Sequence, residues 1–327
     1  MGSTSTVKTT FLLLSDTHGK DLVIPNVTVD VAIHCGDLTD ESKLEEFRTS
    51  LALLMSIDAP LKLVTAGNHD WSLDESAYKR LTAEALTNPD IGPELVKEEY
   101  GDVGEARQLF MDAQDGITFL DEGTHTFRLH NGAALTVYAS PFTPSPEATM
   151  GFQYKLDTEH EFDISPKVNV AITHGPPQGV LDRTASNKRA GSEELFAAIA
   201  KARPLLHCFG HIHESWGAKL VTWRGKETTA STSSTPSHFT EIDNGASNLI
   251  DSAANYKPKK FDREEDIKDR KKRREQLFRD GFRSTGSCSP ASGQQTLFVN
   301  AALEIAPEDE DAREMVPWIV ELDLPSA

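Results

Sequence analysis

Seven residues of types that bind metal ions follow directly after short apolar runs in this sequence. The first two are Asp16 and His18, which come after the apolar run at residues 11–14. Residues i and i+2 of an extended chain point to the same side, so this D-x-H spacing directs a carboxylate and an imidazole toward one point. Later apolar runs are followed by Asp37, Asn68, His174, His211 and His213. The recurrence indicates one shared site rather than unrelated polar turns.

The types of these side chains indicate the chemistry. Carboxylate, imidazole and amide oxygen together suit divalent ions such as Mn²⁺, Fe²⁺, Zn²⁺ or Mg²⁺, and the lack of cysteine in the set argues against a structural zinc site. Seven ligands are too many for one octahedral ion that also holds substrate, so two ions that share one carboxylate fit better. Such a centre keeps a net positive charge, which can hold a phosphate ester and lower the pKa of a bridging water.

His69 follows Asn68 directly but is expected to point elsewhere in a tight loop. It is placed to protonate a leaving alkoxide as general acid, with either Asp70 or Asp40 to orient its imidazole. No G-x-S-x-G motif and no P-loop competes with this interpretation. The remaining histidines of interest are interpreted as structural: His34, His125 and His207.

Five buried strands must position these residues, because each apolar run is short and is bounded by turn residues. The expected strands cover residues 11–14, 29–35, 61–65, 168–173 and a run that ends at Phe209. Helical spacing of apolar residues predicts helices at residues 41–57, 74–86, 105–113 and 191–203, the first of them with Asp40 as its N-cap. Strands that alternate with helices and end in polar residues indicate an α/β fold.

The middle of the chain departs from this alternation. Residues 89–101 are expected to form a loop or lid, and three strands, paired as hairpins, are expected between residues 117 and 140. The proline-rich residues 140–146 are expected to lack regular structure. The aromatic residues within 151–154 either line a pocket or pack the loop, and both interpretations stay open.

Residues 225–295 interrupt the α/β pattern altogether. The segment has Ser-rich ends and contains the run DREEDIKDRKKRREQ, so we interpret it as a low-complexity, charged insertion with a solvated helix at about residues 262–280. Its basic residues 268–274 suit a nuclear-localisation or partner-binding patch, but we favour a charged helix laced by its own i,i+4 ion pairs. On this interpretation, residues 1–224 and 296–327 form one domain around the insertion.

The overall composition restricts the class of partner. The formal net charge of the 327-residue chain is −18, which argues against a nucleic-acid polymer and leaves a small phosphorylated substrate. No apolar run is long enough to span a membrane and no secretory-type leader opens the chain, so we expect a cytoplasmic protein, with the nucleus as the alternative. The start, MGSTST, loosely matches an N-myristoylation pattern, but we interpret it as a polar terminus and expect no stable membrane association.

The three cysteines are widely spaced and form no C-x-x-C pair, which indicates a reducing compartment without disulfides. Cys35 and Cys208 fall within apolar strands, where they are expected to be buried as small apolar side chains. Cys288 lies in the charged insertion.

Five motifs occur in order on the expected strand ends: D-x-H, GD, GNHD, THG and GHIH. In this order they resemble the calcineurin-like metallophosphoesterase superfamily. The stretches ITHGPP, RPLLHCFGHIHE and LFVNAAL are similar to the branch of metallophosphoesterase-domain-containing proteins related to class III cyclic-nucleotide phosphodiesterases. The resemblance covers about residues 11–220 and closing strands near residues 296–324. It implies a four-layer α/β/β/α sandwich, with two mixed sheets flanked by helices.

The resemblance also implies a role for each candidate residue. The first ion would be held by Asp16, His18 and His213. The second ion would be held by Asn68, His174 and His211. Asp37 would bridge the two ions, and His69 would be the catalytic histidine. In some animal members of the branch a glycine replaces the first histidine of GHIH and activity is weak, whereas this chain keeps His211.

One departure from the wider superfamily bears on the substrate. The GD motif continues as GDLTDES rather than as the GDxVDRG of protein phosphatases, so the phosphate-binding arginine of that motif is missing. We therefore expect hydrolysis of a phosphodiester, such as a cyclic nucleotide, by a metal-bridging hydroxide with His69 as general acid. The alternative is a small-molecule phosphomonoesterase or pyrophosphatase on the same metals. A third hypothesis is an interaction protein that binds a protein partner through residues 225–295.

Overall fold

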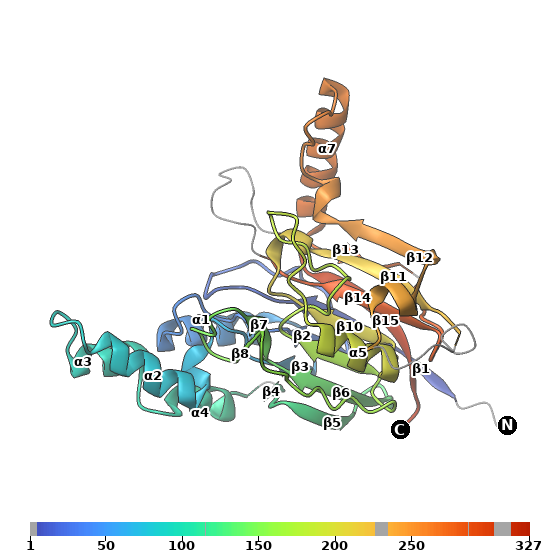
Figure 1. Cartoon of the computed structure of the whole chain (residues 1–327). Helices are drawn as coiled ribbons and strands as arrows, with labels where there is room; N and C mark the ends of the chain where they lie inside the picture. The colour runs from blue at the N-terminus through green and yellow to red at the C-terminus, as the bar shows by residue number, and fades with distance from the viewer. Residues whose placement is uncertain (1–4, 115, 226–234, 287, 304–314) are drawn as a thin grey trace.

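The computed structural model describes residues 5–114, 116–225, 235–286, 288–303 and 315–327 (Figure 1). Most of the myristoylation-like start of the chain lies outside these residues. Across the described ranges, no helix is both long enough and apolar enough to cross a lipid bilayer.

The first sheet is built from β1 (Thr6–Leu14), β2 (Val31–His34), β3 (Leu61–Val64), β4 (Ile117–Phe119), β13 (Arg283–Ser284) and β15 (Trp318–Pro325). Its order is β13-β15-β1-β2-β3-β4. β1, β2, β3 and β4 run in parallel, whereas β15 pairs with β1 in the opposite direction. The sheet is therefore mixed, and β1 lies near its centre.

The second sheet is built from β5 (Gly123–Arg128), β6 (Ala134–Ser140), β9 (Val170–Thr173), β10 (Leu206–Phe209), β11 (Gly217–Trp223), β12 (Ile242–Ser252) and β14 (Gln295–Asn300). Its order is β12-β11-β14-β10-β9-β6-β5. The central strands β6, β9, β10 and β14 are parallel, and the outer strands β5, β11 and β12 are antiparallel to their neighbours. A separate parallel pair consists of β7 (Thr143–Ser145) and β8 (Gln153–Lys155).

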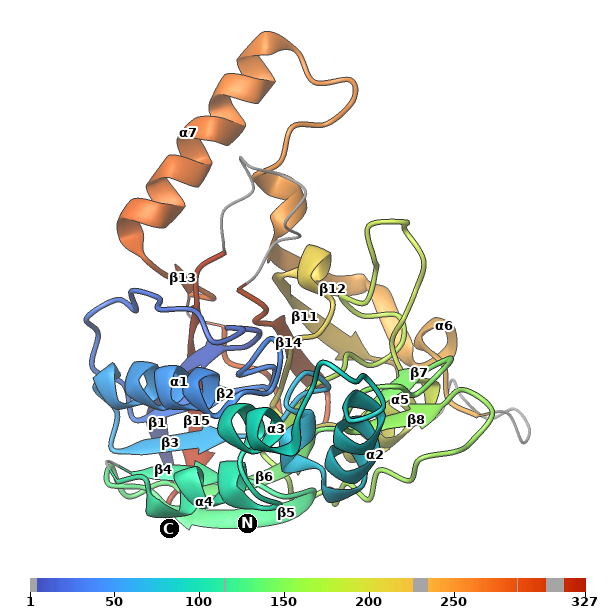
Figure 2. The ribbon, with the colours of Figure 1, turned by 90° about the vertical axis from the view of Figure 1, so that its left-hand side faces the viewer.

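Helices and short 3-10 turns connect and cover the strands. The α-helices are α1 (Leu44–Ser56), α2 (Glu75–Ala85), α3 (Pro93–Tyr100), α4 (Glu105–Asp112), α5 (Glu193–Ala202), α6 (His238–Glu241) and α7 (Glu264–Asp280). The 3-10 turns are η1 (Trp71–Leu73), η2 (His213–Ser215) and η3 (Ala253–Asn255). Figures 1 and 2 show α7 projecting from the body of the molecule.

The end of β1 shows how side chains are divided between the layers. Phe11 and Leu13 enter the core between the two sheets, whereas Leu12 and Leu14 enter the core beneath α1 and α4. All four are fully buried, and each contributes about 1.5 to 3 kcal/mol by leaving water. All four positions are therefore apolar because both faces of this strand are covered.

The second sheet is covered on its outer face in the same way. Phe209 of β10 and Phe298 of β14 pack against Leu195, Phe196 and Ile199 of α5. The order of layers is thus α1 and α4, first sheet, second sheet, α5. This confirms the α/β/β/α sandwich of two mixed sheets that the resemblance implied.

Several predicted elements differ in detail. α1 begins at Leu44 instead of residue 41, and Asp40 is not its N-cap: Lys43 takes that position, while the Glu46 side chain accepts from the backbone N–H of Asp40 and Lys43. Residues 93–100 form α3 rather than a loop, because a proline is tolerated in the first turn of a helix. β4 belongs to the other sheet from the hairpin β5–β6, and the proline-rich stretch forms the short strand β7.

Residues 225–295 contribute more than the expected helix. The helix is confirmed as α7, and Arg270 on it forms an ion pair with Asp262 at 2.7 Å. In addition, β12 pairs with β11 along an edge of the second sheet, and β13 pairs with β15 in the first. Leu277 of α7 is buried in the core between the sheets. Part of the segment is therefore integral to the sandwich.

Candidate metal centre

The carboxyl ends of five strands bring the seven candidate ligands together. β1, β2 and β3 are parallel neighbours in the first sheet, and β9 and β10 are parallel neighbours in the second. Backbone bonds connect the loops that follow them: the N–H of Asp16 donates to the carbonyl of Gly36, and that of Gly210 donates to the carbonyl of His174, each at 2.9 Å. Within each sheet the neighbouring loops are therefore joined, and the backbone N–H of His211 joins the two sheets by donating to the Asp16 carboxylate, as expected for ligand sites at strand ends.

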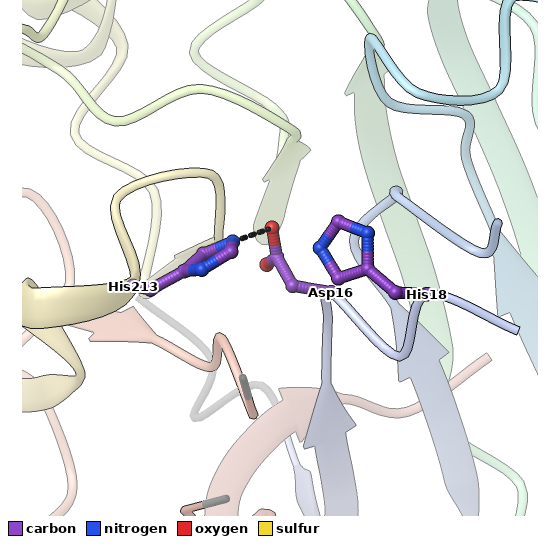
Figure 3. Close-up of side chains that lie close together, drawn as sticks. All are labelled: Asp16, His18 and His213. Carbon is purple, nitrogen blue, oxygen red and sulfur yellow. Dashed lines mark hydrogen bonds and ion pairs between the residues drawn. The ribbon is translucent and has the colours of Figure 1, made fainter. Parts of the chain in front are cut away.

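The first group consists of Asp16, His18 and His213, whose ligand atoms all lie within 4.8 Å of one another. Figure 3 shows the two imidazoles on opposite sides of the Asp16 carboxylate. Nε2 of His213 lies 3.2 Å from Oδ1 of Asp16, and the backbone N–H of His211 donates to both carboxylate oxygens at 3.1 Å. These three side chains are the set that the resemblance implied for the first ion.

The second group consists of Asp37, His174 and His211, again with ligand atoms within 4.8 Å. Nε2 of His174 lies 3.1 Å from Oδ1 of Asn68 and 3.2 Å from Oδ2 of Asp37. The rings of His174 and His211 meet edge to face, with their centroids 5.0 Å apart. The structure thus also brings together the set implied for the second ion.

Asp37 lies between the two groups. Its ligand atoms also fall within 4.8 Å of those of His18 and His69, so one carboxylate faces residues of both halves of the centre. Its Oδ1 accepts a hydrogen bond from the backbone N–H of His69 at 2.8 Å, while Oδ2 faces His174. This is the position that a carboxylate shared by two ions would need.

The hydrogen bonds of His174 show that this part of the centre suits a cation. Its Nδ1 lies 3.0 Å from the backbone carbonyl oxygen of Cys35, which can only accept, so Nδ1 carries a proton. In a neutral ring Nε2 is then an acceptor, yet it faces the acceptor oxygens of Asn68 and Asp37. Three acceptors that converge at about hydrogen-bond distance require positive charge, which either a proton on Nε2 or a divalent ion in its place supplies.

The electrostatics agree with that interpretation. Burial alone would lower the pKa of His174, but the Asp37 carboxylate raises it to about 9. Burial would raise the pKa of Asp37, but the nearby His174 holds it well below its usual range. Burial would likewise raise the pKa of Asp16, but the hydrogen bond from His213 holds it low. Both carboxylates are therefore ionised at neutral pH, as metal ligands must be.

The backbone of the centre is strained. Four of the candidate ligands have positive φ values: Asp16 (57°), His18 (47°), Asp37 (52°) and His211 (67°). Residues with a Cβ atom rarely adopt this left-handed region, and such strain persists where the surrounding structure enforces it, often at functional sites. The clustering of these four in one centre is a second observation, independent of side-chain type, that agrees with a functional site.

Close backbone approach explains two glycines of the motifs. A Cβ atom at Gly67 would lie 2.2 Å from Oδ1 of Asp37, and one at Gly210 would lie 2.0 Å from Oδ2 of Asp16. Either side chain would displace a carboxylate. The glycines of GNHD and GHIH are therefore needed to let neighbouring loops pass beside the two aspartates.

His69 is oriented by Asp40. Its Nδ1 lies 2.7 Å from the backbone carbonyl oxygen of Asp40 and 3.6 Å from the carboxylate of the same residue. The Asp40 carboxylate is also 3.6 Å from Nδ1 of His18. One aspartate therefore contacts both the expected general acid and an expected ligand of the first ion.

Asp70, the other candidate for orienting His69, has a different role. It is fully buried and accepts hydrogen bonds from the backbone N–H groups of Leu38, Thr39 and Gly67 at 2.8 to 3.1 Å. Its side chain also accepts from the hydroxyl of Thr39 at 2.7 Å. Burial, reinforced by the charge of Asp37, raises the pKa of Asp70 to about 7. Asp70 therefore joins the GD and GNHD loops to each other.

Two buried histidines outside the set support the ligand loops. Nε2 of His34 lies 3.0 Å from the hydroxyl of Thr17, the residue between Asp16 and His18. Nε2 of His207 lies 2.8 Å from the hydroxyl of Thr173, which itself donates to the carbonyl of Gly175. The structural role expected for these histidines is consistent with these bonds. The two threonines were not predicted, and their only sequence signal is adjacency to a ligand.

The aromatic residues 151–154 pack their own loop. Phe152 contacts Phe142 edge to face at 5.9 Å, and Tyr154 stacks on His160 at 5.2 Å. His160 also lies 4.4 Å from Phe142. Of the two interpretations left open, loop packing is the one that these contacts support.

Comparison with known proteins places this geometry in context. Residues 9–215 match the family model described as calcineurin-like phosphoesterase. Human "Metallophosphoesterase domain-containing protein 1" is 29% identical over 216 residues, which cover 64% of this chain and 62% of that protein. "UPF0046 protein K07C11.7" of Caenorhabditis elegans is 29% identical over 209 residues, which cover 62% and 63%. "Probable rhamnogalacturonate lyase C" of Emericella nidulans is 31% identical over 211 residues, which cover 64% of this chain and 18% of that protein.

The chain spans less than two thirds of the length of each of these relatives. The family model, in contrast, covers more than half of the chain. Its match extends from β1 through η2 and so includes all seven candidate ligands and His69. The chain therefore belongs to the calcineurin-like phosphoesterase family.

Proposed function

We propose that this protein is a phosphoesterase that depends on two divalent metal ions. The first ion would be held by Asp16, His18 and His213. The second would be held by Asn68, His174 and His211, and Asp37 would be shared. The observation that carries the proposal is the position of Asp37, whose ligand atoms fall within 4.8 Å of groups in both halves of the centre.

Bound ions would supply positive charge for a phosphate ester and lower the pKa of a coordinated water. The protein's own residues then have two tasks. The ionised Asp16 and Asp37, together with imidazoles that lose their proton when an ion binds, fix where the ions and therefore the substrate phosphate would be held. His69 donates a proton to the leaving oxygen from Nε2, because its Nδ1 is committed to the carbonyl of Asp40.

The segment that carries Asp40, Glu41 and Lys43 is called the rim here. Its charges favour a phosphodiester over a phosphomonoester. Glu41 occupies the place of the arginine found in protein phosphatases, next to Asp40, and both carboxylates are 63% exposed. The ammonium group of Lys43 lies 2.8 Å from the carboxylate of Glu41 and 3.1 Å from that of Glu99. One positive charge is therefore shared between these two carboxylates, and the Asp40 carboxylate adds a third negative charge. A diester carries one negative charge near neutral pH and a monoester carries nearly two. Repulsion by this rim therefore penalises the monoester more strongly.

The test is a paired assay on chelator-stripped protein reloaded with Mn²⁺. A chromogenic phosphodiester is compared with the monoester that has the same leaving group, and cyclic AMP follows. We expect metal-dependent hydrolysis with a higher kcat/KM for the diester. A higher value for the monoester would refute the diester preference while leaving the phosphoesterase chemistry intact.

A further inference from the structure

The amide of Asn68 has two ends, and only one of them can bind a cation. Oδ1 is an acceptor, whereas Nδ2 carries two protons and would repel an ion. A rotation of the amide by half a turn exchanges the two atoms with little change of shape. A residue that accepts a hydrogen bond from Nδ2 would favour the orientation of Asn68 that can bind an ion.

Met150 is in contact with the donor end of this amide. Nδ2 of Asn68 lies 3.4 Å from Sδ of Met150, while Oδ1 faces Nε2 of His174 at 3.1 Å. A thioether sulfur accepts hydrogen bonds and cannot donate them. In the reversed orientation two acceptors, Oδ1 and Sδ, would face each other, so the contact favours the orientation that turns the oxygen toward His174.

The backbone around Met150 is fixed to the loop that carries Asn68. The N–H of Gly151 donates to the carbonyl of Asn68 at 3.1 Å, and the guanidinium of Arg80 donates to the carbonyl of Met150 at 3.2 Å. The N–H of Phe152 donates to the carboxylate of Asp74, the N-cap of α2, at 3.0 Å. These bonds hold the backbone at Met150 in place without the side chain of Asn68.

The two segments also approach too closely for a side chain to lie between them. A Cβ atom at Gly151 would lie 2.6 Å from Cα of Trp71. Asn68 itself is only 4% exposed, so little water is available to its Nδ2. A buried amide N–H without an acceptor costs free energy. The orientation of Asn68 in which Nδ2 donates to Met150 is therefore favoured.

We propose that Met150 is a positioning residue that fixes the Asn68 amide with its oxygen toward the second metal position. The inference rests on the proposed function, because it concerns a ligand of that centre. Met150 lies 82 positions after Asn68 in the chain, and no ligand motif in the sequence indicates this role. Loss of such an outer contact to a metal ligand typically weakens the affinity for the metal about 10- to 100-fold.

Two substitutions separate the acceptor from the volume of the side chain. Met150→Leu keeps the size but removes the acceptor, and Met150→Gln keeps an acceptor on a side chain of similar length. Met111→Leu is the matched control, because Met111 is 66% exposed on α4 and far along the chain from the ligands. Asn68→Ala shows the effect of losing the ligand itself.

The readout is Mn²⁺ binding to the metal-free full chain, measured by calorimetry and by equilibrium dialysis. We expect Met150→Leu to lower the affinity for the second ion about tenfold and to leave the affinity for the first ion unchanged. Met150→Gln should bind the second ion with an affinity closer to that of the unaltered protein. Equal weakening of both ions would indicate a general folding defect and would overturn the proposed role. The first ion therefore serves as an internal control for folding.

The two proposals fail in different ways. If Met150→Leu binds two ions as tightly as the unaltered chain, Met150 has no positioning role and the proposed function stands. If the unaltered chain itself binds fewer than two ions, the proposed function is overturned, and the role of Met150 with it.

Discussion

Nδ1 of His69 lies 2.7 Å from the backbone carbonyl oxygen of Asp40. A carbonyl can only accept, so this contact places a proton on Nδ1 and leaves Nε2 to exchange a proton with the substrate. The Asp40 carboxylate lies 3.6 Å from the same nitrogen, so one residue contacts Nδ1 through both its backbone and its side chain. The relationship assigns His69 a chemical task distinct from that of the neighbouring ligand Asn68.

His69→Ala is expected to reduce kcat most for substrates with poor leaving groups. Removal of a general acid costs about 10² to 10⁴ in rate where the leaving alkoxide must be protonated, and much less where the leaving group is a stable phenolate. The measurement compares kcat for an alkyl ester and a p-nitrophenyl ester of the same phosphate class. An equal loss on both esters would show that His69 acts as a metal ligand or a structural residue instead.

Glu41→Arg is expected to move the specificity toward monoesters. The change restores a cation where protein phosphatases have one and removes a carboxylate from the rim. We expect the monoester-to-diester ratio of kcat/KM to rise by roughly three- to tenfold, as for a partly exposed ion contact. Glu45→Arg is the charge-matched control, on α1 and 81% exposed. An equal change of the ratio in both variants would contradict a local role of Glu41.

His211→Gly is expected to be more stable than His211→Ala in the metal-free state. The residue has a φ of 67°, a region that glycine adopts freely and alanine does not. The difference should be about 1 kcal/mol in the free energy of unfolding, measured by denaturant titration. The backbone conformation at this position is therefore one that suits glycine. Equal stability of the two variants would show that the strain is relieved by relaxation.

His207 is expected to make the protein less stable as the pH falls. Burial lowers its pKa to about 3 in the folded state, whereas an unfolded histidine titrates near 6.5. The unfolded chain therefore binds the proton first, so the contribution is complete above about pH 6.5 and is lost progressively as the pH falls from 6.5 toward 3. The loss of unfolding free energy approaches about 1.4 kcal/mol per pH unit for this one proton.

His207→Gln removes the titration but keeps an N–H donor toward Thr173. The free energy of unfolding of this variant should fall less steeply than that of the unaltered protein between pH 6.5 and 4. His130→Gln, at an exposed position, is the matched control for the substitution. Parallel curves for His207→Gln and the unaltered chain would contradict the assignment of the proton to His207.

The strand ends of the centre could be predicted because their signals are local. An apolar run followed by Asp16 and His18 is visible in a few residues, and the parallel strands then bring such ends to one edge. The contact of Met150 with Asn68 could not be predicted, because it joins residues far apart in sequence through loop packing. The role of Asp40 was one of two open alternatives for the same reason.

The segment after residue 225 shows a second limit of prediction. β12 is an edge strand with two buried residues among eleven, so no alternation of apolar and polar residues marks it. Its place beside β11 follows from backbone pairing that composition does not reveal. Removing residues 226–294 would therefore also remove an edge of the second sheet, so binding by α7 is better tested with charge substitutions at residues 268–274.

The most direct test of the proposed dinuclear centre is a titration of the metal-free protein with Mn²⁺ in which bound metal and diester hydrolysis are followed together. We predict that two ions bind per chain and that activity develops only as the second ion binds. Asp37→Asn, which alters the shared ligand, should weaken both ions and reduce the rate by at least about a hundredfold. Full activity without bound metal, or no hydrolysis of either ester class with two ions bound, would contradict the proposal.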